Sequence, residues 1–233
     1  MLTSHKVKNN YLMLAKDLIS DVIPALRTSD TGTKALGWMD IFKVAHLPIV
    51  NNEEFLGVIS ESDIYDVNMP DEPLGNHPLS LRRPYVLENQ HVFEIMDVMS
   101  RLQLSLIPVL NLKKQYIGVI SLPDLLHYFA ELSALKNPGG IIVLELIEND
   151  YSLAHIAQIV EENGAKILST YITAHKDSTK IELTLKLNVV DLTSIIQTFD
   201  RYEYTIVGAH MRVDEMDDLM EDRFDLLMRY LNV

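Results

Sequence analysis

The 233-residue chain contains no cysteine, so it forms no disulfides, uses no thiolate in catalysis and offers no cysteine ligands to zinc. This composition fits the reducing cytosol, and we expect a cytoplasmic protein. Basic residues are also scarce, because 20 Lys and Arg stand against 33 Asp and Glu, which gives a net charge of −13. Such a charge repels the phosphate backbone of DNA or RNA, and we therefore expect no binding to nucleic acid.

Long apolar runs are missing as well. The apolar run 141–144 ends at Glu145, and His5, Lys6 and Lys8 near the N-terminus are not followed by an apolar stretch. The sequence therefore predicts no signal peptide and no membrane-spanning helix. Hydrophobic residues nevertheless make up 48% of the chain, which is enough for the cores of two ordinary domains.

Catalytic signatures are absent too. The chain has no G-x-S-x-G elbow, Walker loop or Rossmann fingerprint, and its eight histidines do not show the spacing of zinc ligands. We therefore predict no catalytic residue, no metal site and no tightly bound cofactor, and we do not expect an enzyme.

The sequence instead contains one pattern twice, about sixty residues apart. The segments 47–51 and 56–60 recur as 107–111 and 117–121, and each copy places an aspartate three residues after its last serine. The branched apolar residues predict two short buried strands joined by a tight turn. The serine and aspartate have the spacing of a helix N-cap, whose free backbone N–H groups favour an anion. Taken alone, Ser60 and Ser121 indicate only capped helices.

The duplicated pattern resembles the CBS domain, whose repeats carry an apolar-Pro-apolar strand and a Gly-apolar-apolar-Ser/Thr-x-x-Asp segment. Two copies in tandem resemble the CBS pair, or Bateman module, over about residues 15 to 132. The resemblance implies a cleft between the repeats that binds an adenosyl ligand such as AMP, ADP, ATP, NAD or S-adenosylmethionine. It implies ribose contacts from Asp63 and Asp124, and ribose or phosphate contacts from Ser60 and Ser121. The residues implied to lie beside an adenine are Val58, Val119, His46 and Ile107.

Two arginines start the strand that opens the second repeat, which is expected over 82–86. Arg82 and Arg83 either meet ligand phosphates as paired cations or form the solvated end of the proline-rich linker 69–78. The first repeat has Asp21 before its own opening strand, where a carboxylate repels a phosphate. We therefore expect unequal clefts and at most one strong nucleotide site.

The breaker cluster at 137–140 predicts the start of a second domain. The spacing then predicts a βαββαβ order, with strands over 141–147, 166–174, 180–188 and 204–212 and helices over 152–163 and 191–200. This order gives a four-stranded antiparallel sheet with both helices on one face. The segment 149–167 resembles the ACT domain, a regulatory module that commonly binds amino acids. Tyr151 and Ser152 replace the usual Pro-Gly of its ligand loop, which favours assembly or signal relay over amino-acid sensing.

The fold class is therefore α+β, with an arm over 1–14, a CBS pair over 15–136, an ACT-like domain over 137–213 and an amphipathic helix over 214–233. The two repeats are expected over about 15–67 and 79–132, and the domain order resembles the acetoin-utilisation protein B group. The leading hypothesis is a regulatory protein that senses an adenosyl ligand, forms a homodimer or larger oligomer, and acts on a protein partner. The alternative is an assembly module with vestigial clefts.

Overall fold

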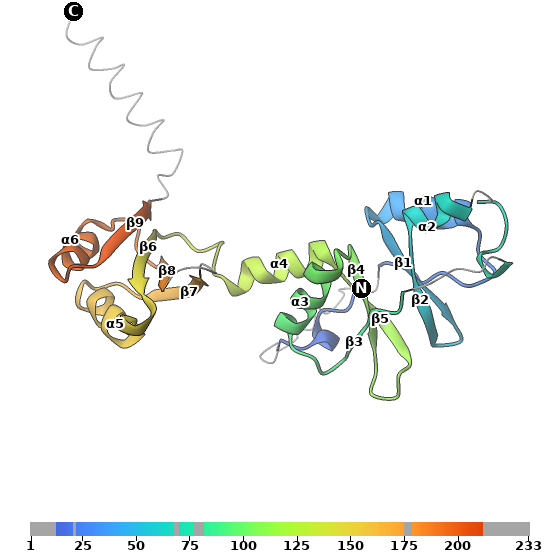
Figure 1. Ribbon diagram of the computed structural model, residues 1–233, viewed down its shortest axis with the longest axis horizontal. Helices are drawn as coiled ribbons and strands as arrows, with labels where there is room; N and C mark the ends of the chain where they lie inside the picture. The colour runs from blue at the N-terminus through green and yellow to red at the C-terminus, as the bar shows by residue number, and fades with distance from the viewer. Residues whose placement is uncertain (1–12, 21, 68–69, 77–81, 175–178, 212–233) are drawn as a thin grey trace, which may run out of the picture. The chain divides into compact units, whose positions relative to one another are not determined.

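The computed structural model describes residues 13–20, 22–67, 70–76, 82–174 and 179–211 (Figure 1). Its contacts divide the chain into two units, residues 1–128 and 129–233. Most of the predicted arm over 1–14 and the whole predicted helix over 214–233 lie outside the described residues. Within the described ranges, no helix is both long and apolar enough to cross a bilayer.

The first unit contains the two repeats. The first repeat consists of α1 (Gly32–Phe42), β1 (His46–Asn51), β2 (Glu54–Ser60) and α2 (Glu61–Val67). The second consists of β3 (Val86–Leu87), α3 (Val92–Leu102), β4 (Leu106–Leu110), β5 (Tyr116–Ser121) and α4 (Leu122–Leu132). Two short 3-10 turns, η1 (Ala15–Asp17) and η2 (Leu74–Asn76), lie in the segments that precede and follow the first repeat's elements.

The two copies of the sequence pattern also share their strand pairing and backbone conformation. His46 pairs with Ser60 across β1 and β2, and Leu106 pairs with Ser121 across β4 and β5. Both hairpins shift register at the same place, directly after the apolar residue that follows the proline: between Ile49 and Val50, and between Val109 and Leu110. Both α1 and α3 end at a residue in the left-handed conformation. The two copies therefore place corresponding side chains at corresponding positions.

The strand expected over 82–86 is much shorter in the structure. Only β3 pairs in parallel with β4, while Arg82 forms a single bridge with Val58 of the first repeat. Pro84 lies between these two pairings, and a proline cannot donate a ladder hydrogen bond. In the first repeat, the position equivalent to β3 is reduced to one parallel bridge between Leu26 and Ile49.

The two repeats exchange their leading segments. Ser20, in the leading segment of the first repeat, donates its backbone N–H to Val119 of β5. Val58 of β2 donates to the carbonyl of Arg82, in the leading segment of the second repeat. Ala15 and Leu18 are buried in the core of the second repeat. Each repeat therefore presents its β-hairpin to the segment that leads into the other.

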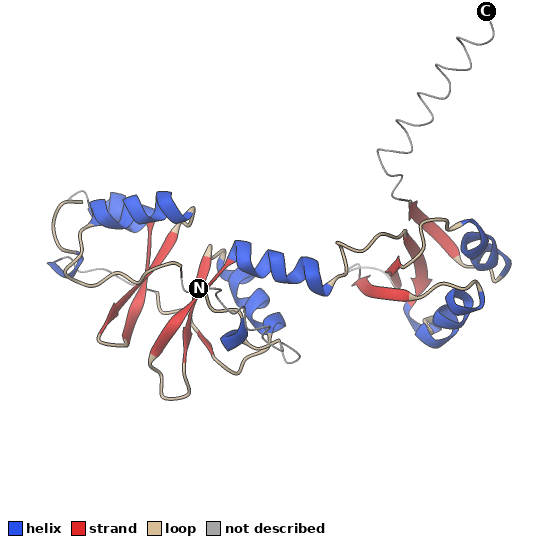
Figure 2. Ribbon diagram, turned by 180° about the vertical axis from the view of Figure 1, so that it is seen from behind, coloured by secondary structure: helices blue, strands red, loops and turns tan. Residues whose placement is uncertain are grey.

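The second unit has the predicted βαββαβ order. Its elements are β6 (Ile141–Ile147), η3 (Glu148–Asp150), α5 (Leu153–Glu162), β7 (Ile167–Ala174), β8 (Lys180–Leu187), α6 (Thr193–Arg201) and β9 (Thr205–His210). The sheet order is β7-β8-β6-β9, with antiparallel neighbours throughout, which confirms the ferredoxin-like arrangement. Both helices cover the same face of the sheet, as Figure 2 shows.

The opposite face of this sheet is partly covered by the chain that leads into it. Ser169 of β7 donates its hydroxyl hydrogen to the Ser133 carbonyl over 2.9 Å, and the rings of Phe129 and Tyr171 lie 6.1 Å apart. Buried Lys186 donates to the Gly139 carbonyl over 2.6 Å. These contacts explain why the second unit begins inside α4, ahead of the junction predicted at 137–140.

Candidate functional site

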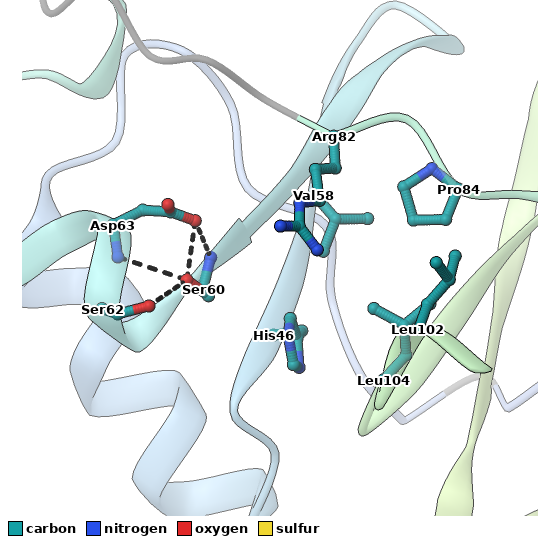
Figure 3. Close-up of a pocket in the computed structure, with 9 residues that line it drawn as sticks. All are labelled: His46, Val58, Ser60, Ser62, Asp63, Arg82, Pro84, Leu102 and Leu104. Carbon is teal, nitrogen blue, oxygen red and sulfur yellow. Dashed lines mark hydrogen bonds between the residues drawn. The ribbon is translucent and has the colours of Figure 1, made fainter. Parts of the chain in front are cut away.

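A cavity of about 240 Å³ lies between the two repeats of the first unit. Its lining residues come from β1, β2, α2, the segment before β3, and the end of α3 with the loop that follows. They are His46, Val58, Ser60, Ser62, Asp63, Arg82, Pro84, Leu102 and Leu104. In Figure 3 the hydroxyl and carboxylate groups lie on one side and the proline and leucines on the other. We call this cavity the inter-repeat cleft.

Ser60 and Asp63 form a reciprocal cap at the polar side of the cleft. The backbone N–H of Asp63 donates to Ser60 Oγ over 3.2 Å. Asp63 Oδ2 in turn accepts from the backbone N–H and the hydroxyl of Ser60, both at 2.7 Å. Asp63 Oδ1 makes no hydrogen bond with any residue that the structure describes. The cap thus uses one carboxylate oxygen and leaves the other to accept a hydrogen bond from a ligand hydroxyl.

Arg82 is held at the cleft by its backbone rather than by its side chain. Its carbonyl accepts from the N–H of Val58 over 2.9 Å, which fixes the residue beside β2. Its side chain is exposed and lines the cleft. A guanidinium in this place can donate two parallel hydrogen bonds to a phosphate.

His46 lies at the start of β1, and its ring is held by Ser105 of the second repeat. The backbone N–H of Ser105 donates to His46 Nδ1 over 3.3 Å, and the Ser105 hydroxyl lies 3.0 Å from the same nitrogen. Burial lowers the pKa of His46 below its ordinary value of 6.5, and nearby Arg82 lowers it further, while Asp63 raises it. The ring is therefore neutral near pH 7, with its proton on Nε2 because Nδ1 accepts.

This lowered pKa predicts a pH-dependent stability that the variant His46→Gln lacks. The unfolded chain binds a proton at His46 at a higher pH than the folded chain does. The histidine's contribution therefore falls as the pH drops through 6.5 toward the lower folded-state value. Urea unfolding followed by the fluorescence of Trp38, the single tryptophan, measures the free energy of unfolding between pH 8 and pH 5. Parallel curves for the two proteins would contradict this account.

The structure brings five of the ten predicted site residues together in the cleft. They are His46, Val58, Ser60, Asp63 and Arg82. The neighbouring Arg83 is exposed and does not line this cavity.

The other four predicted residues belong to the second repeat. Ser121 and Asp124 form the same cap on α4, since Ser121 Oγ accepts from the Asp124 N–H and donates to its carboxylate. Val119 and Ile107 are fully buried in the two cores of the first unit. The register makes Leu106, also fully buried, the counterpart of His46. The corresponding region of the second repeat is thus chemically different.

Four residues of the cleft were not among the predicted ones: Ser62, Pro84, Leu102 and Leu104. Ser62 lies within the Ser-x-x-Asp segment, and its hydroxyl is 2.8 Å from that of Ser60. Leu102 and Leu104 lie at the end of α3 and in the loop that follows it, in the other repeat. Together with Pro84 and Val58 they form the apolar wall of the cleft.

The family model of the CBS domain matches residues 15–69 and again residues 79–131. The first unit therefore carries two CBS domains in tandem, and the Ser-x-x-Asp caps and the cleft lie within the matched segments. No group of three or more His, Asp or Glu side chains that could hold a metal ion occurs among the described residues.

Several solved structures are similar to about half of the chain. A CBS domain pair/ACT domain protein from Thermotoga maritima is 22% identical, with a TM-score of 0.45 over 51% of this chain and 98% of that one. CBSX2 in complex with AMP is 14% identical, with a TM-score of 0.44 over 51% and 96%. The CBS domain pair of protein MJ0100, in complex with 5′-methylthioadenosine and S-adenosyl-L-methionine, is 20% identical, with a TM-score of 0.42 over 52% and 98%.

Proposed function

We propose that this protein is a regulatory sensor whose inter-repeat cleft binds an adenosyl ligand. The observation that carries the proposal is the division of the cleft into an apolar wall and a polar side. Val58, Pro84, Leu102 and Leu104 offer a flat apolar surface to a purine. Asp63 Oδ1 offers an acceptor to ribose hydroxyls, and Arg82 offers a cation to a phosphate.

The volume of the cleft agrees with a nucleoside-sized ligand. At about 240 Å³ it lies just below the range of roughly 300–1,000 Å³ that is common for drug-sized ligands. The nucleoside part of the ligand fills the enclosed part of the cleft, and the phosphates of a nucleotide extend toward the exposed Arg82. His46 is neutral near pH 7, so it can donate one hydrogen bond from Nε2 without adding charge.

A ligand that binds between the repeats can shift them from one arrangement to another only if it binds the second arrangement more tightly than the first. We propose that the ferredoxin-like unit, which resembles an ACT domain, passes this change to an oligomer or a protein partner in the cytoplasm. Ser152 caps α5 at the loop where that family usually carries Pro-Gly, through a 3.4 Å hydrogen bond from the His155 N–H. This favours relay over amino-acid binding, in a chain whose domain order resembles the acetoin-utilisation protein B group.

The paired caps provide a matched test of the ligand site. Asp63→Ala and Asp124→Ala each remove the carboxylate that accepts from the capping serine's hydroxyl, and each should cost about 0.5–2 kcal/mol of stability. Only Asp63 lines the inter-repeat cleft. We expect Asp63→Ala to weaken ligand binding by about 1–3 kcal/mol, or roughly tenfold or more, while Asp124→Ala binds as the natural protein does.

The measurement is calorimetric titration with adenosine, AMP, ADP, ATP, NAD and S-adenosylmethionine, with thermal shifts in parallel. At least one of these ligands should bind and raise the melting temperature. If none binds at millimolar concentration, the clefts are vestigial and the repeats serve assembly. If the two aspartate variants lose affinity equally, the ligand does not contact Asp63.

A further inference from the structure

A second cavity, of about 580 Å³, adjoins the inter-repeat cleft and has no part in the function proposed above. It lies between α3, the start of α4 and the residues that lead into β1. Its lining residues are Ala45, His46, Met96, Met99, Ser100, Gln103, Leu104, Ser105, Leu122 and Leu125. We call it the methionine pocket. His46 and Leu104 line both cavities and form the wall between them.

The lining of the methionine pocket is free of charge. It contains no Asp, Glu, Lys or Arg, and its one titratable side chain, His46, is neutral near pH 7 because burial lowers its pKa. A phosphate or carboxylate in this pocket would give up part of its hydration without meeting a cation. The lining therefore favours an uncharged ligand over a charged one.

The remaining chemistry indicates a mostly apolar ligand with one hydrogen-bonding group. Two methionines and three leucines supply an adaptable apolar surface, since thioether side chains repack around ligands of different shape. Gln103 ends α3 and carries both a donor and an acceptor on its side chain. The hydroxyl of Ser105 is already engaged with the Ala45 N–H and with His46.

We propose that the methionine pocket is a second binding site, which takes an uncharged, mostly apolar small molecule. Its volume lies within the range of roughly 300–1,000 Å³ that is common for small-molecule sites, and it combines apolar walls with few polar groups as such sites do. The site stands independently of the nucleotide proposal. Its occupant packs against His46, the side chain that also faces the inter-repeat cleft.

The internal repeat supplies a control inside the same molecule. Met99 of α3 corresponds to Met39 of α1, and both side chains are 2% exposed. Met99 lines the methionine pocket, whereas Met39 is packed in the core of the first repeat and does not line it. A ligand of the pocket must therefore perturb Met99 and Met96 but not Met39.

The test uses the full chain with 13C-labelled methionine methyl groups and indole as the probe. The three signals are assigned with Met39→Leu, Met96→Leu and Met99→Leu variants. We expect indole to shift the Met96 and Met99 signals along a saturable curve and to leave Met39 in place. Shifts that stay linear, or that are as large at Met39, would overturn the proposal.

A cavity-filling variant makes the same test by a second route. Ser100→Phe places a ring in the pocket from an exposed position and should remove the saturable shift at Met96. If that variant does not fold, the comparison of Met99 with Met39 in the natural protein still decides. Methionine shifts that follow protein concentration and ignore indole would show that a second copy of the chain covers the pocket, and the small-molecule site would be rejected.

Discussion

Replacing Phe199 by alanine should strongly destabilise the second unit while leaving the stability of the first unit unchanged. Phe199 lies on α6, is fully buried, and packs edge-to-face on Tyr204 with ring centroids 5.4 Å apart. Removing a buried phenylalanine leaves a cavity and costs about 3–5 kcal/mol, which is a large share of the roughly 5–15 kcal/mol that stabilises a typical domain. The core that loses this contact lies entirely in the second unit.

Two probes separate the units. Trp38 is in α1 of the first unit, so its fluorescence reports the unfolding of the first unit alone. Amide hydrogen exchange in β6 and β8 reports the second. We expect the exchange protection of these strands to collapse and the Trp38 transition to remain in place. Tyr202→Ala is the control in the same unit, because Tyr202 is 49% exposed and should cost about 1 kcal/mol or less. An equal shift of the Trp38 transition would mean that the two units unfold as one.

Replacing Arg82 by glutamine should weaken the binding of phosphate-bearing ligands and leave the binding of adenosine unchanged. The backbone carbonyl that holds this residue beside Val58 is retained in the variant, so the cleft keeps its shape. What disappears is one charge-assisted contact from an exposed guanidinium, worth about 1–2 kcal/mol after allowance for solvent screening, or roughly 5- to 30-fold in affinity. Adenosine makes no such contact and should bind both proteins equally.

Arg83→Gln is the matched control for this experiment. It removes the same charge from the adjacent residue, which is exposed and does not line the cleft. Calorimetric titrations of AMP, ADP and adenosine at about 0.15 M salt, where charges beyond about 8 Å are screened, distinguish a contact from a general attraction. An equal effect of the two arginine variants would show that the arginines act only through net charge. An equal loss of affinity for adenosine in Arg82→Gln would show that Arg82 does not contact the phosphate.

The sequence predicted the elements of each unit well because those elements rest on local patterns. The apolar strand runs, the Ser-x-x-Asp caps and the alternation of Ile181, Leu183 and Leu185 are each visible within a dozen residues. The βαββαβ order then leaves few ways to arrange the sheet. Several element ends differ by one or two residues, as at α6, where the helix was expected to start at Asp191 and begins at Thr193. The strand expected over 82–86 differs more, because β3 begins only at Val86.

The site was harder to predict because half of it comes from the other repeat. Leu102 and Leu104 form part of the apolar wall, but no local pattern connects them with Ser60 or Asp63 some forty residues earlier. The sequence alone also does not show which residue of the second repeat corresponds to His46. A shift of one residue along a strand moves a side chain to the opposite face, so Leu106 and Ile107 cannot be distinguished without the pairing of β4 with β5.

The exchange of leading segments between the repeats sets a limit on how small this architecture can be. Ala15 and Leu18 lie in the core of the second repeat, although they belong to the leading segment of the first repeat, ahead of α1. An isolated second repeat would lack the two side chains that complete its hydrophobic core, and it could regain them only from the leading segment of another molecule.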